Sequence, residues 1–235
     1  MRVAIYNDTF IARKPHFGCE LVMTTFREQL DRVGIELVGT VKLTDRNPKN
    51  KILGKADLVI VNGEGSFHHN RRNDLATVSK HFPSILINTV FEDNSIDVSS
   101  FKYISARESI SAANLNCDII PDIILTSNKL ETIRRNGIEP GNRFGHIRHN
   151  SGIRTLQRLT PFLQELCQYA SVTSESFHGI LVCYILGIPC IEVLPGAGVP
   201  WKTYSVAKDI ESAENYLETG RNKINNLFEN LHTFT

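Results

Sequence analysis

Short apolar runs rich in β-branched residues alternate with helical patterns in the first half of the chain, and this alternation restricts the fold more than any other feature. The runs are apolar at successive positions, which is typical of strands buried on both faces. The segments between them repeat apolar residues about every 3.6 positions, which is typical of helices. This order predicts an α/β fold with a Rossmann-like, doubly wound parallel sheet. The predicted strands are residues 2–6, 35–40, 57–62, 84–89, 102–105 and 118–120, and the predicted helices are residues 19–33, 73–81 and 108–115.

The pattern weakens over residues 127–142, which are polar and contain Gly137 and Pro140. We interpret this range as a linker. It divides the chain into an N-terminal Rossmann-like domain, residues 1–126, and a shortened C-terminal Rossmann-like domain, residues 143–235. The second domain is predicted to hold strands 143–148, 171–173 and 189–193, helices 161–169 and 177–186, and a closing amphipathic helix near 210–231 that packs back across the sheet.

Two local signals predict helix ends in the second domain. Thr160 followed by Pro161 predicts an N-cap and a first helical position. Gly187 predicts the end of the apolar helix 177–186, because glycine adopts the left-handed conformation that ends many helices.

The charge balance gives no global attraction to nucleic acid or membranes, because 26 basic and 25 acidic residues leave a net charge of +1. Between Lys129 and Arg158, seven Lys or Arg residues stand against two Glu residues, a local excess of +5 (7 − 2). This segment either meets an anionic ligand or forms a solvated basic surface.

The five cysteines and the apolar runs predict the compartment. The spacing of the cysteines suits neither a disulfide framework nor a zinc site. The first ten residues are too short and too polar for a signal peptide. No apolar run approaches the ~20 residues of a membrane span. We therefore expect a cytoplasmic protein without a transmembrane segment. The cysteines are Cys19, Cys117, Cys167, Cys183 and Cys190.

Ligands of open α/β sheets bind outside the carboxyl ends of the strands, and the first candidate loop, residues 7–20, follows the first predicted strand. It carries Arg13, Lys14 and His16, and Gly18 leads into a helix whose free N–H groups suit an anion. A polar surface loop is the alternative interpretation.

The second loop, residues 62–69, has the sequence NGEGSFHH. Its glycines let the backbone approach a ligand and present Glu64, which can take a proton from an acceptor hydroxyl. A tight turn with an exposed glutamate is the alternative. His68 and His69 do not share a face, and further zinc ligands at ordered spacing are lacking, so we predict no metal site.

The third loop, residues 174–179, has the sequence SESFHG and precedes an apolar helix. Glu175 and Ser176 lie at a helix N-terminus that favours a phosphate or carboxylate. His178, in the first turn, can donate a hydrogen bond or protonate a phosphate leaving group. The alternative is a capping serine beside a structural histidine.

Together, six ordered segments resemble the landmarks of the polysaccharide pyruvyltransferase family. The resemblance implies two Rossmann-like domains in a GT-B-like arrangement, and transfer of a pyruvyl group from phosphoenolpyruvate to sugar hydroxyls as a ketal. It covers residues 1 to about 205, and it implies no cofactor besides the donor substrate. The segments are HFGCEL at 16–21, NGEGSFH at 62–68, SARES at 105–109, PDIIL at 121–125, HIRH at 146–149 and VTSESFHGILVCYILGIPCI at 172–191.

The resemblance, with the loops above, assigns expected roles. Glu64, or else His68, acts as the base, and His178 completes the catalytic set. The N-terminal loop covers the acceptor. The residues expected to bind the donor's anionic part are Arg148, His178, Ser176, Arg107 and Gly18, and those expected on the acceptor side are Asn7, Asp8 and His16.

Two departures from the family pattern accompany the resemblance. Many members have an arginine where this chain has Ser176, and a guanidinium there would clamp phosphate and carboxylate. The second half of the chain is also shorter than usual. The expected partners remain a small activated donor and a carbohydrate acceptor.

Two other functions stay open. A nucleotide-sugar-dependent glycosyltransferase can act on a glycan or, less favoured, on hydroxylated bases in DNA, with the basic segment contacting phosphates. Against it, Val182 stands where retaining enzymes of this architecture usually have a ribose-binding glutamate. A non-catalytic carbohydrate- or nucleotide-binding protein is the third possibility.

Overall fold

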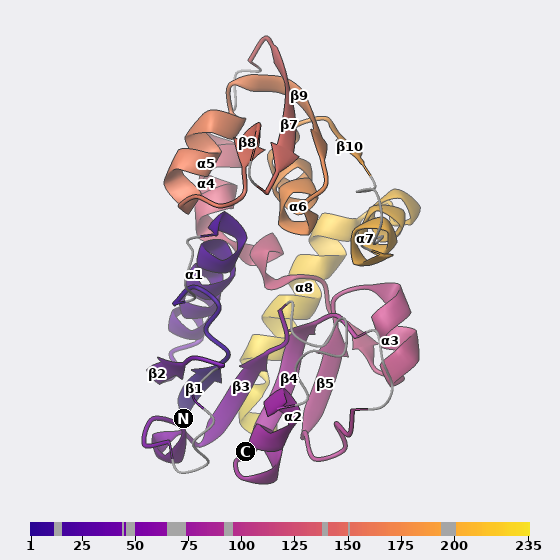
Figure 1. The fold of residues 1–235 in the computed structure, drawn as a ribbon. Coiled ribbons are helices and arrows are strands. Elements are labelled where there is room, and N and C mark those ends of the chain that lie inside the picture. The colour runs from indigo at the N-terminus through magenta and orange to yellow at the C-terminus, as the bar shows by residue number, and fades with distance from the viewer. Residues whose placement is uncertain are drawn as a thin grey trace.

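The computed structural model of the chain contains two sheets, each built only from parallel strands (Figure 1). The structure describes residues 1–11, 16–43, 45, 50–64, 74–91, 96–137, 141–149, 151–193 and 201–235, and for 201–206 it describes the backbone alone. The predicted α/β class with Rossmann-like parallel sheets is confirmed.

The first sheet has six strands in the order β2-β1-β3-β4-β5-β6. Every strand predicted in the first half is present within one or two residues. Successive side chains of a strand point to opposite faces, and both faces of this sheet are covered. The strands are β1 (Arg2–Tyr6), β2 (Glu36–Val41), β3 (Leu58–Asn62), β4 (Ser84–Thr89), β5 (Tyr103–Ala106) and β6 (Asp118–Ile119).

Helices cover the first sheet as the apolar spacing predicts. The helix α1 (Phe17–Arg32) is followed by Gly34 at φ +67°, which ends it. The predicted helix 73–81 is a short α-helix, α2 (Asp74–Thr77), that continues as a 3-10 turn, η3 (Val78–Lys80). The helix α3 (Ser109–Leu115) starts after its N-cap Glu108, whose carboxylate accepts hydrogen bonds from two backbone N–H groups.

The second sheet has four strands in the order β10-β9-β7-β8. The central helix of this half, α6 (Phe177–Leu186), has the predicted bounds, with Ser176 as N-cap and Gly187 at φ +73° after its last turn. The strand β8 is not among the predicted elements. The strands are β7 (Arg143–Arg148), β8 (Ile153–Arg154), β9 (Tyr169–Ser174) and β10 (Cys190–Glu192).

The predicted helix at 161–169 with Thr160 as N-cap is wrong in both ends. The helix α5 (Leu159–Leu166) has Arg158 as its N-cap residue, without a side-chain cap of its own. Instead, the carboxylate of Glu20 in α1 accepts a hydrogen bond from Leu159 N at 2.9 Å and two from Arg158. This cap comes from a residue far away in the sequence, so no local signal marks it.

The range 127–142, predicted as the linker, contains the helix α4 (Asn128–Arg135). Ser127 caps it and Leu130 is fully buried. One buried apolar cluster joins the two halves of the chain, since it includes Ile60 of the first sheet and Ile147 of the second.

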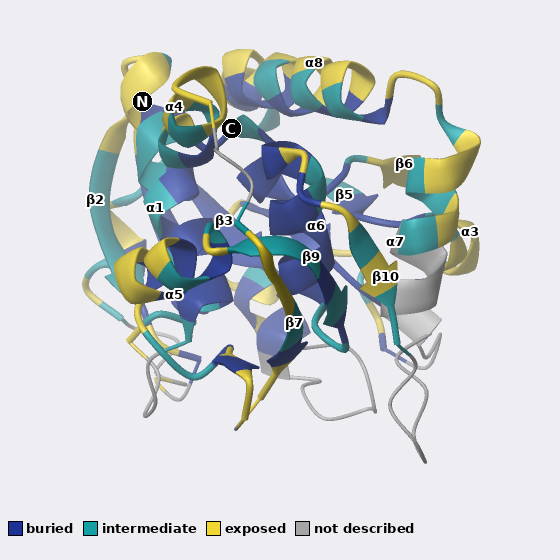
Figure 2. Ribbon diagram, turned by 90° about the horizontal axis from the view of Figure 1, so that it is seen from above, coloured by how far each residue is buried: buried dark blue, intermediate teal, exposed yellow. Residues whose placement is uncertain are grey.

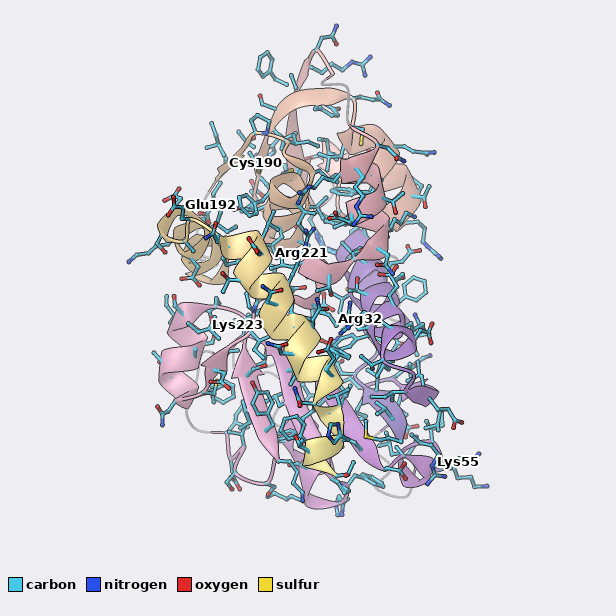
Figure 3. The ribbon with its side chains drawn as sticks, turned by 180° about the vertical axis from the view of Figure 1, so that it is seen from behind. Arg32, Lys55, Cys190, Glu192, Arg221 and Lys223 are labelled. Atoms are coloured by element: carbon cyan, nitrogen blue, oxygen red, sulfur yellow. The ribbon has the colours of Figure 1, made fainter. Side chains whose placement is uncertain are left out.

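The single closing helix predicted near 210–231 is wrong: two helices are present, α7 (Trp201–Ser212) and α8 (Tyr216–Glu229), followed by the 3-10 turn η5 (Leu231–Phe234). The carboxylate of Asp209 in α7 accepts hydrogen bonds from the backbone N–H and the hydroxyl of Ser109, the first residue of α3. The helix α7 therefore lies beside α3 and not along the path of α8. As expected, α8 returns across the first sheet (Figure 3). None of the helices in the described part of the chain is long and apolar enough to cross a bilayer.

Candidate functional site

A buried histidine lies between two carboxylates at the junction of the two halves. His178 Nε2 is 3.2 Å from Asp122 Oδ2, and His178 Nδ1 is 3.7 Å from Glu64 Oε1. All three residues are buried. The structure therefore brings Glu64 and His178 together, although 114 positions separate them in the sequence (178 − 64).

Strand ends and a helix start place these three side chains. Glu64 follows the carboxyl end of β3, and Asp122 follows β6 as the N-cap of the 3-10 turn η4 (Ile123–Thr126). His178 is the second residue of α6, which approaches from the second half. Figure 1 shows α6 above the carboxyl ends of the first sheet. The site thus occupies the position where open parallel sheets bind their ligands.

Arg107 completes the buried charges. Its Nη1 lies 2.7 Å from Asp122 Oδ2, and its guanidinium stacks 3.9 Å from the centroid of the Phe177 ring. Burial alone raises the pKa of Asp122, but His178 and Arg107 outweigh it and hold that pKa below its usual value. With two carboxylates and one guanidinium, the group carries no net charge once the imidazole is protonated. Arg107 Nε is buried and has no hydrogen-bond partner in the described part of the chain.

Glu64 is held by the N-terminal part of the chain. Thr9 Oγ1 donates a hydrogen bond to Glu64 Oε2 at 2.6 Å, and Cys19 Sγ lies 3.7 Å from Glu64 Oε1. Burial and the neighbouring Glu64 charge raise the pKa of the Cys19 thiol. The thiol therefore stays protonated and serves as a donor rather than as a nucleophile.

Gly18 packs directly against the imidazole. A Cβ at this position would lie 2.4 Å from His178 Nδ1, which is closer than real Cβ contacts come. The start of α1 can approach His178 this closely only because residue 18 is a glycine. The structure therefore brings Gly18 into the site by contact, while its predicted anion-binding role stays a prediction.

A chain of buried asparagines connects the loops that carry the two carboxylates. Asn62 Oδ1 accepts hydrogen bonds from Glu64 N and from Asn88 Nδ2, both at 3.2 Å. Asn88 Oδ1 in turn accepts a hydrogen bond from Ile123 N at 3.3 Å, next to Asp122. Asn88 adopts φ +57°, which is uncommon for a residue other than glycine. These amides set the spacing of the loops on either side of His178.

Among the predicted donor-binding residues, Arg148 and Ser176 have other partners. Arg148 ends β7 and forms an ion pair with Glu175 at 3.4 Å, and His146 Nε2 lies at the same distance from that carboxylate. Ser176 Oγ accepts a hydrogen bond from Gly179 N at 3.3 Å. The structure thus joins Arg107 to His178 through Asp122, and it pairs Arg148 with Glu175.

The predicted acceptor-side residues contact both their own turns and distant segments of the chain. Asn7, at φ +67°, donates a hydrogen bond to Asn62 O at 2.6 Å. Asp8 accepts hydrogen bonds from Phe10 N and Ile11 N. His16 is the N-cap of α1 and accepts a hydrogen bond from Gly18 N. His68, with Arg13 and Lys14, lies outside the described residues.

Several residues of the site were not predicted. Asp122 lies inside the PDIIL landmark, so a carboxylate directly after a short strand was an available signal. Thr9 and Cys19 lie inside the first candidate loop, without a signal that links them to Glu64. Nothing in the sequence indicated a role for Asn88, because the hydrogen-bond partners of a polar side chain near the end of a buried strand depend on tertiary contacts. Within the described residues, no group of three His, Cys, Asp or Glu side chains is arranged to hold a metal ion.

Two parallel sheets, with a buried acid–base cluster at the carboxyl ends of one of them, define an α/β protein of Rossmann-like fold. The chain is similar in structure to a functionally uncharacterised protein from Klebsiella pneumoniae subsp. pneumoniae NTUH-K2044, with a TM-score of 0.59 and 14% sequence identity over 92% of this chain and 90% of that one. This likeness concerns the fold. No family model and no curated protein matches the chain.

Proposed function

We propose that this protein is a transferase that modifies a sugar hydroxyl, with pyruvyl transfer from phosphoenolpyruvate as the leading reaction. One observation carries the proposal: His178 is buried between Glu64 and Asp122 at a strand-end junction. Charged groups are seldom buried together without a role, and titratable clusters of this kind concentrate at catalytic sites. The resemblance to polysaccharide pyruvyltransferases supplies the substrate class.

The cluster suits proton transfer in two directions. Glu64 accepts the proton of the attacking hydroxyl, and His178 Nδ1, 3.7 Å away, shares it. Asp122 accepts the hydrogen bond of the opposite ring nitrogen and so orients the imidazole. The protonated imidazole can then donate to a leaving phosphate. In this arrangement Glu64 is the base, and the protonated imidazole of His178, oriented by Asp122, is the acid.

Ketal formation requires such a pair. Two acceptor O–H bonds are replaced by two C–O bonds to C2 of phosphoenolpyruvate, while the C2–C3 double bond becomes a single bond and the bond between C2 and the phosphate oxygen breaks. One hydroxyl proton goes to the methylene carbon, which becomes a methyl group, and the other leaves with inorganic phosphate. Arg107 Nε, which has no protein partner in the described part of the chain, supplies a donor for the anionic substrate.

The GT-B-like arrangement is part of this proposal. Its support is the position of the cluster, which takes Glu64 and Asp122 from the first half and His178 from the second. A donor bound at the start of α6 would face an acceptor bound over β3. Ser176 Oγ caps α6 and does not replace the family's guanidinium, so the proposal assigns the anion to Arg107 and His178.

The test is a thermal-shift panel of phosphoenolpyruvate, UDP, GDP and CMP, since a ligand that binds the folded protein raises its melting temperature. We expect phosphoenolpyruvate to stabilise the protein and His178→Ala to abolish that shift. The matched control is His232→Ala, because His232 is exposed at the C-terminus. Stabilisation by a nucleotide alone would favour the glycosyltransferase. An unchanged phosphoenolpyruvate shift in His178→Ala would refute the proposed site.

A further inference from the structure

A cavity of about 660 Å³ lies between α6, the edge strand β10 and α7, on a different part of α6 from His178. Its size is within the range of small-molecule sites in proteins, about 300–1,000 Å³. On α6 the cavity is lined by Ile180 and Tyr184, whereas His178 contributes to the candidate site. Its lining residues in the described part of the chain are Ile180, Tyr184, Gly187, Ile188, Pro189, Cys190, Ile191, Glu192, Ala207, Ile210 and Glu211.

The walls of the cavity are mostly apolar. Ile180 and Tyr184 are one helical turn apart on α6 and therefore share a face. Ile188 closes the turn after α6, and Ile210 faces them from α7. Such walls bind the apolar body of a ligand, but they do not select for the charge that the ligand carries.

The polar end of the cavity is negative. Glu192 lies on β10, toward α7 (Figure 3), and Glu211 lies on α7. Glu192 Oε1 is buried, and no hydrogen-bond donor in the described part of the chain reaches it. Burial first, and then the charge of Glu211, raise the pKa of Glu192. A buried carboxylate oxygen without a donor is unfavourable. Among the described residues that line this end of the cavity, none supplies a positively charged hydrogen-bond donor.

We propose that this cavity binds a small organic cation, a primary amine or a guanidinium carried on an apolar body. The cation donates hydrogen bonds to Glu192 Oε1 and offsets the repulsion between Glu192 and Glu211. The apolar body fills the space between the isoleucines and Tyr184. The site is separate from the His178 cluster and does not depend on the proposed transferase activity.

The experiment compares three probes with one skeleton: phenethylamine, 2-phenylethanol and phenylacetate. They are titrated into the ¹⁵N-labelled full chain and followed by amide chemical shifts. We expect saturable shifts at residues 188–192 and 207–211 with phenethylamine. The alcohol should bind at least about tenfold more weakly, because hydrogen bonds to charged groups are the stronger ones. Phenylacetate should give no saturable shift.

Two variants and a control make the result specific. Glu192→Gln should weaken phenethylamine binding by about tenfold or more, and Ala207→Phe should abolish it by filling the cavity. The matched control, Glu36→Gln, changes an exposed carboxylate on β2 and should leave binding unchanged. The inference is overturned if the amine and the alcohol bind equally, if the shifts map elsewhere, or if Glu192→Gln binds the amine as tightly as the unsubstituted chain.

Discussion

The two parallel sheets of this protein differ in how they are covered. In the first sheet, alternate residues of β3 enter two separate cores, with Ile60 in one and Val59 in the other. In the second sheet, β7 buries Ile147 in the core shared by both halves but leaves Phe144 85% exposed, and Ile191 of β10 is 69% exposed. Figure 2 shows the exposed segments on β7 and β10, whereas the central strands β3 and β4 of the first sheet are buried throughout.

The direction of the connections explains the difference. The crossovers from β8 through α5 to β9, and from β9 through α6 to β10, run the same way along the second sheet. Right-handed crossovers in one direction place both helices on the same face. Helices in the described part of the chain therefore cover only one face of the second sheet, and this sheet holds α6 against the first sheet. We expect the junction and the first sheet to contribute most to stability, and the outer face of the second sheet to contribute least.

The largest effect is expected at the junction between the two halves. Arg107→Met removes one of the two partners of the buried Asp122 carboxylate, and breaking a buried ion pair in this way costs about 3–5 kcal/mol. Urea unfolding at neutral pH measures the loss. Arg2→Met, at an exposed ion pair with Asp57, is the control and should change little. If the two variants had the same urea midpoint of unfolding, the junction would not be a major contributor to stability.

The next prediction compares the two sheets directly. Ile60→Ala leaves a cavity in a closely packed core and should lower the free energy of unfolding by about 2–5 kcal/mol. Phe144→Ser changes a side chain that is already in solvent and should stay within about 0.5 kcal/mol. The same urea titrations measure both. A cost for Phe144→Ser close to that of Ile60→Ala would mean that the outer face of the second sheet is covered in solution.

A smaller effect is expected where α1 meets His178. Gly18→Ala places a methyl group 2.4 Å from His178 Nδ1, so the imidazole or the start of α1 must move, at a cost of about 1–3 kcal/mol. Thermal unfolding measures the cost, and the proton NMR signals of His178 report the displacement. Gly54→Ala is the control, because a Cβ there would meet nothing within 4 Å. An unmoved His178 signal in Gly18→Ala would contradict the contact.

The smallest effect concerns the cap that joins α1 to α5. Partial burial by itself raises the pKa of Glu20, but the hydrogen bonds from Arg158 and Leu159 N outweigh it, so this pKa lies below its usual value. A carboxylate with a lowered folded-state pKa stabilises the protein above the unfolded-state pKa, about 4.3, and loses that contribution as the pH falls through the folded-state pKa.

Glu20→Gln should therefore cost about 0.5–1 kcal/mol at pH 7, because Arg158 is largely exposed and solvent screens the pair. The difference from the unsubstituted chain should shrink below about pH 4. Urea unfolding at pH 7 and pH 3 gives both values. A deficit that is independent of pH would assign the effect to packing rather than to charge.

The candidate site was predictable in part. Glu64 and His178 were identified because a glycine-rich turn after a strand and a capped apolar helix are local patterns. Asp122, Thr9 and Asn88 were not, because each acquires its partner through contacts between segments far apart in the chain. The pairing of Arg148 with Glu175 was missed for the same reason, since no local spacing indicates which charge a strand end will meet.

The sequence alone determined the elements whose signals are local. The bounds of β1, β4, β7 and α6 match their predicted ranges, because apolar periodicity, the Ser176 cap and the Gly187 stop act within a few residues of the backbone they control. Tertiary structure decided the start of α5, the break between α7 and α8, and the meeting of His178 with its two carboxylates. For α5 and for the His178 cluster, the deciding group is a side chain from a distant segment. Its position depends on how the sheets twist and the crossovers pack, which no local pattern encodes.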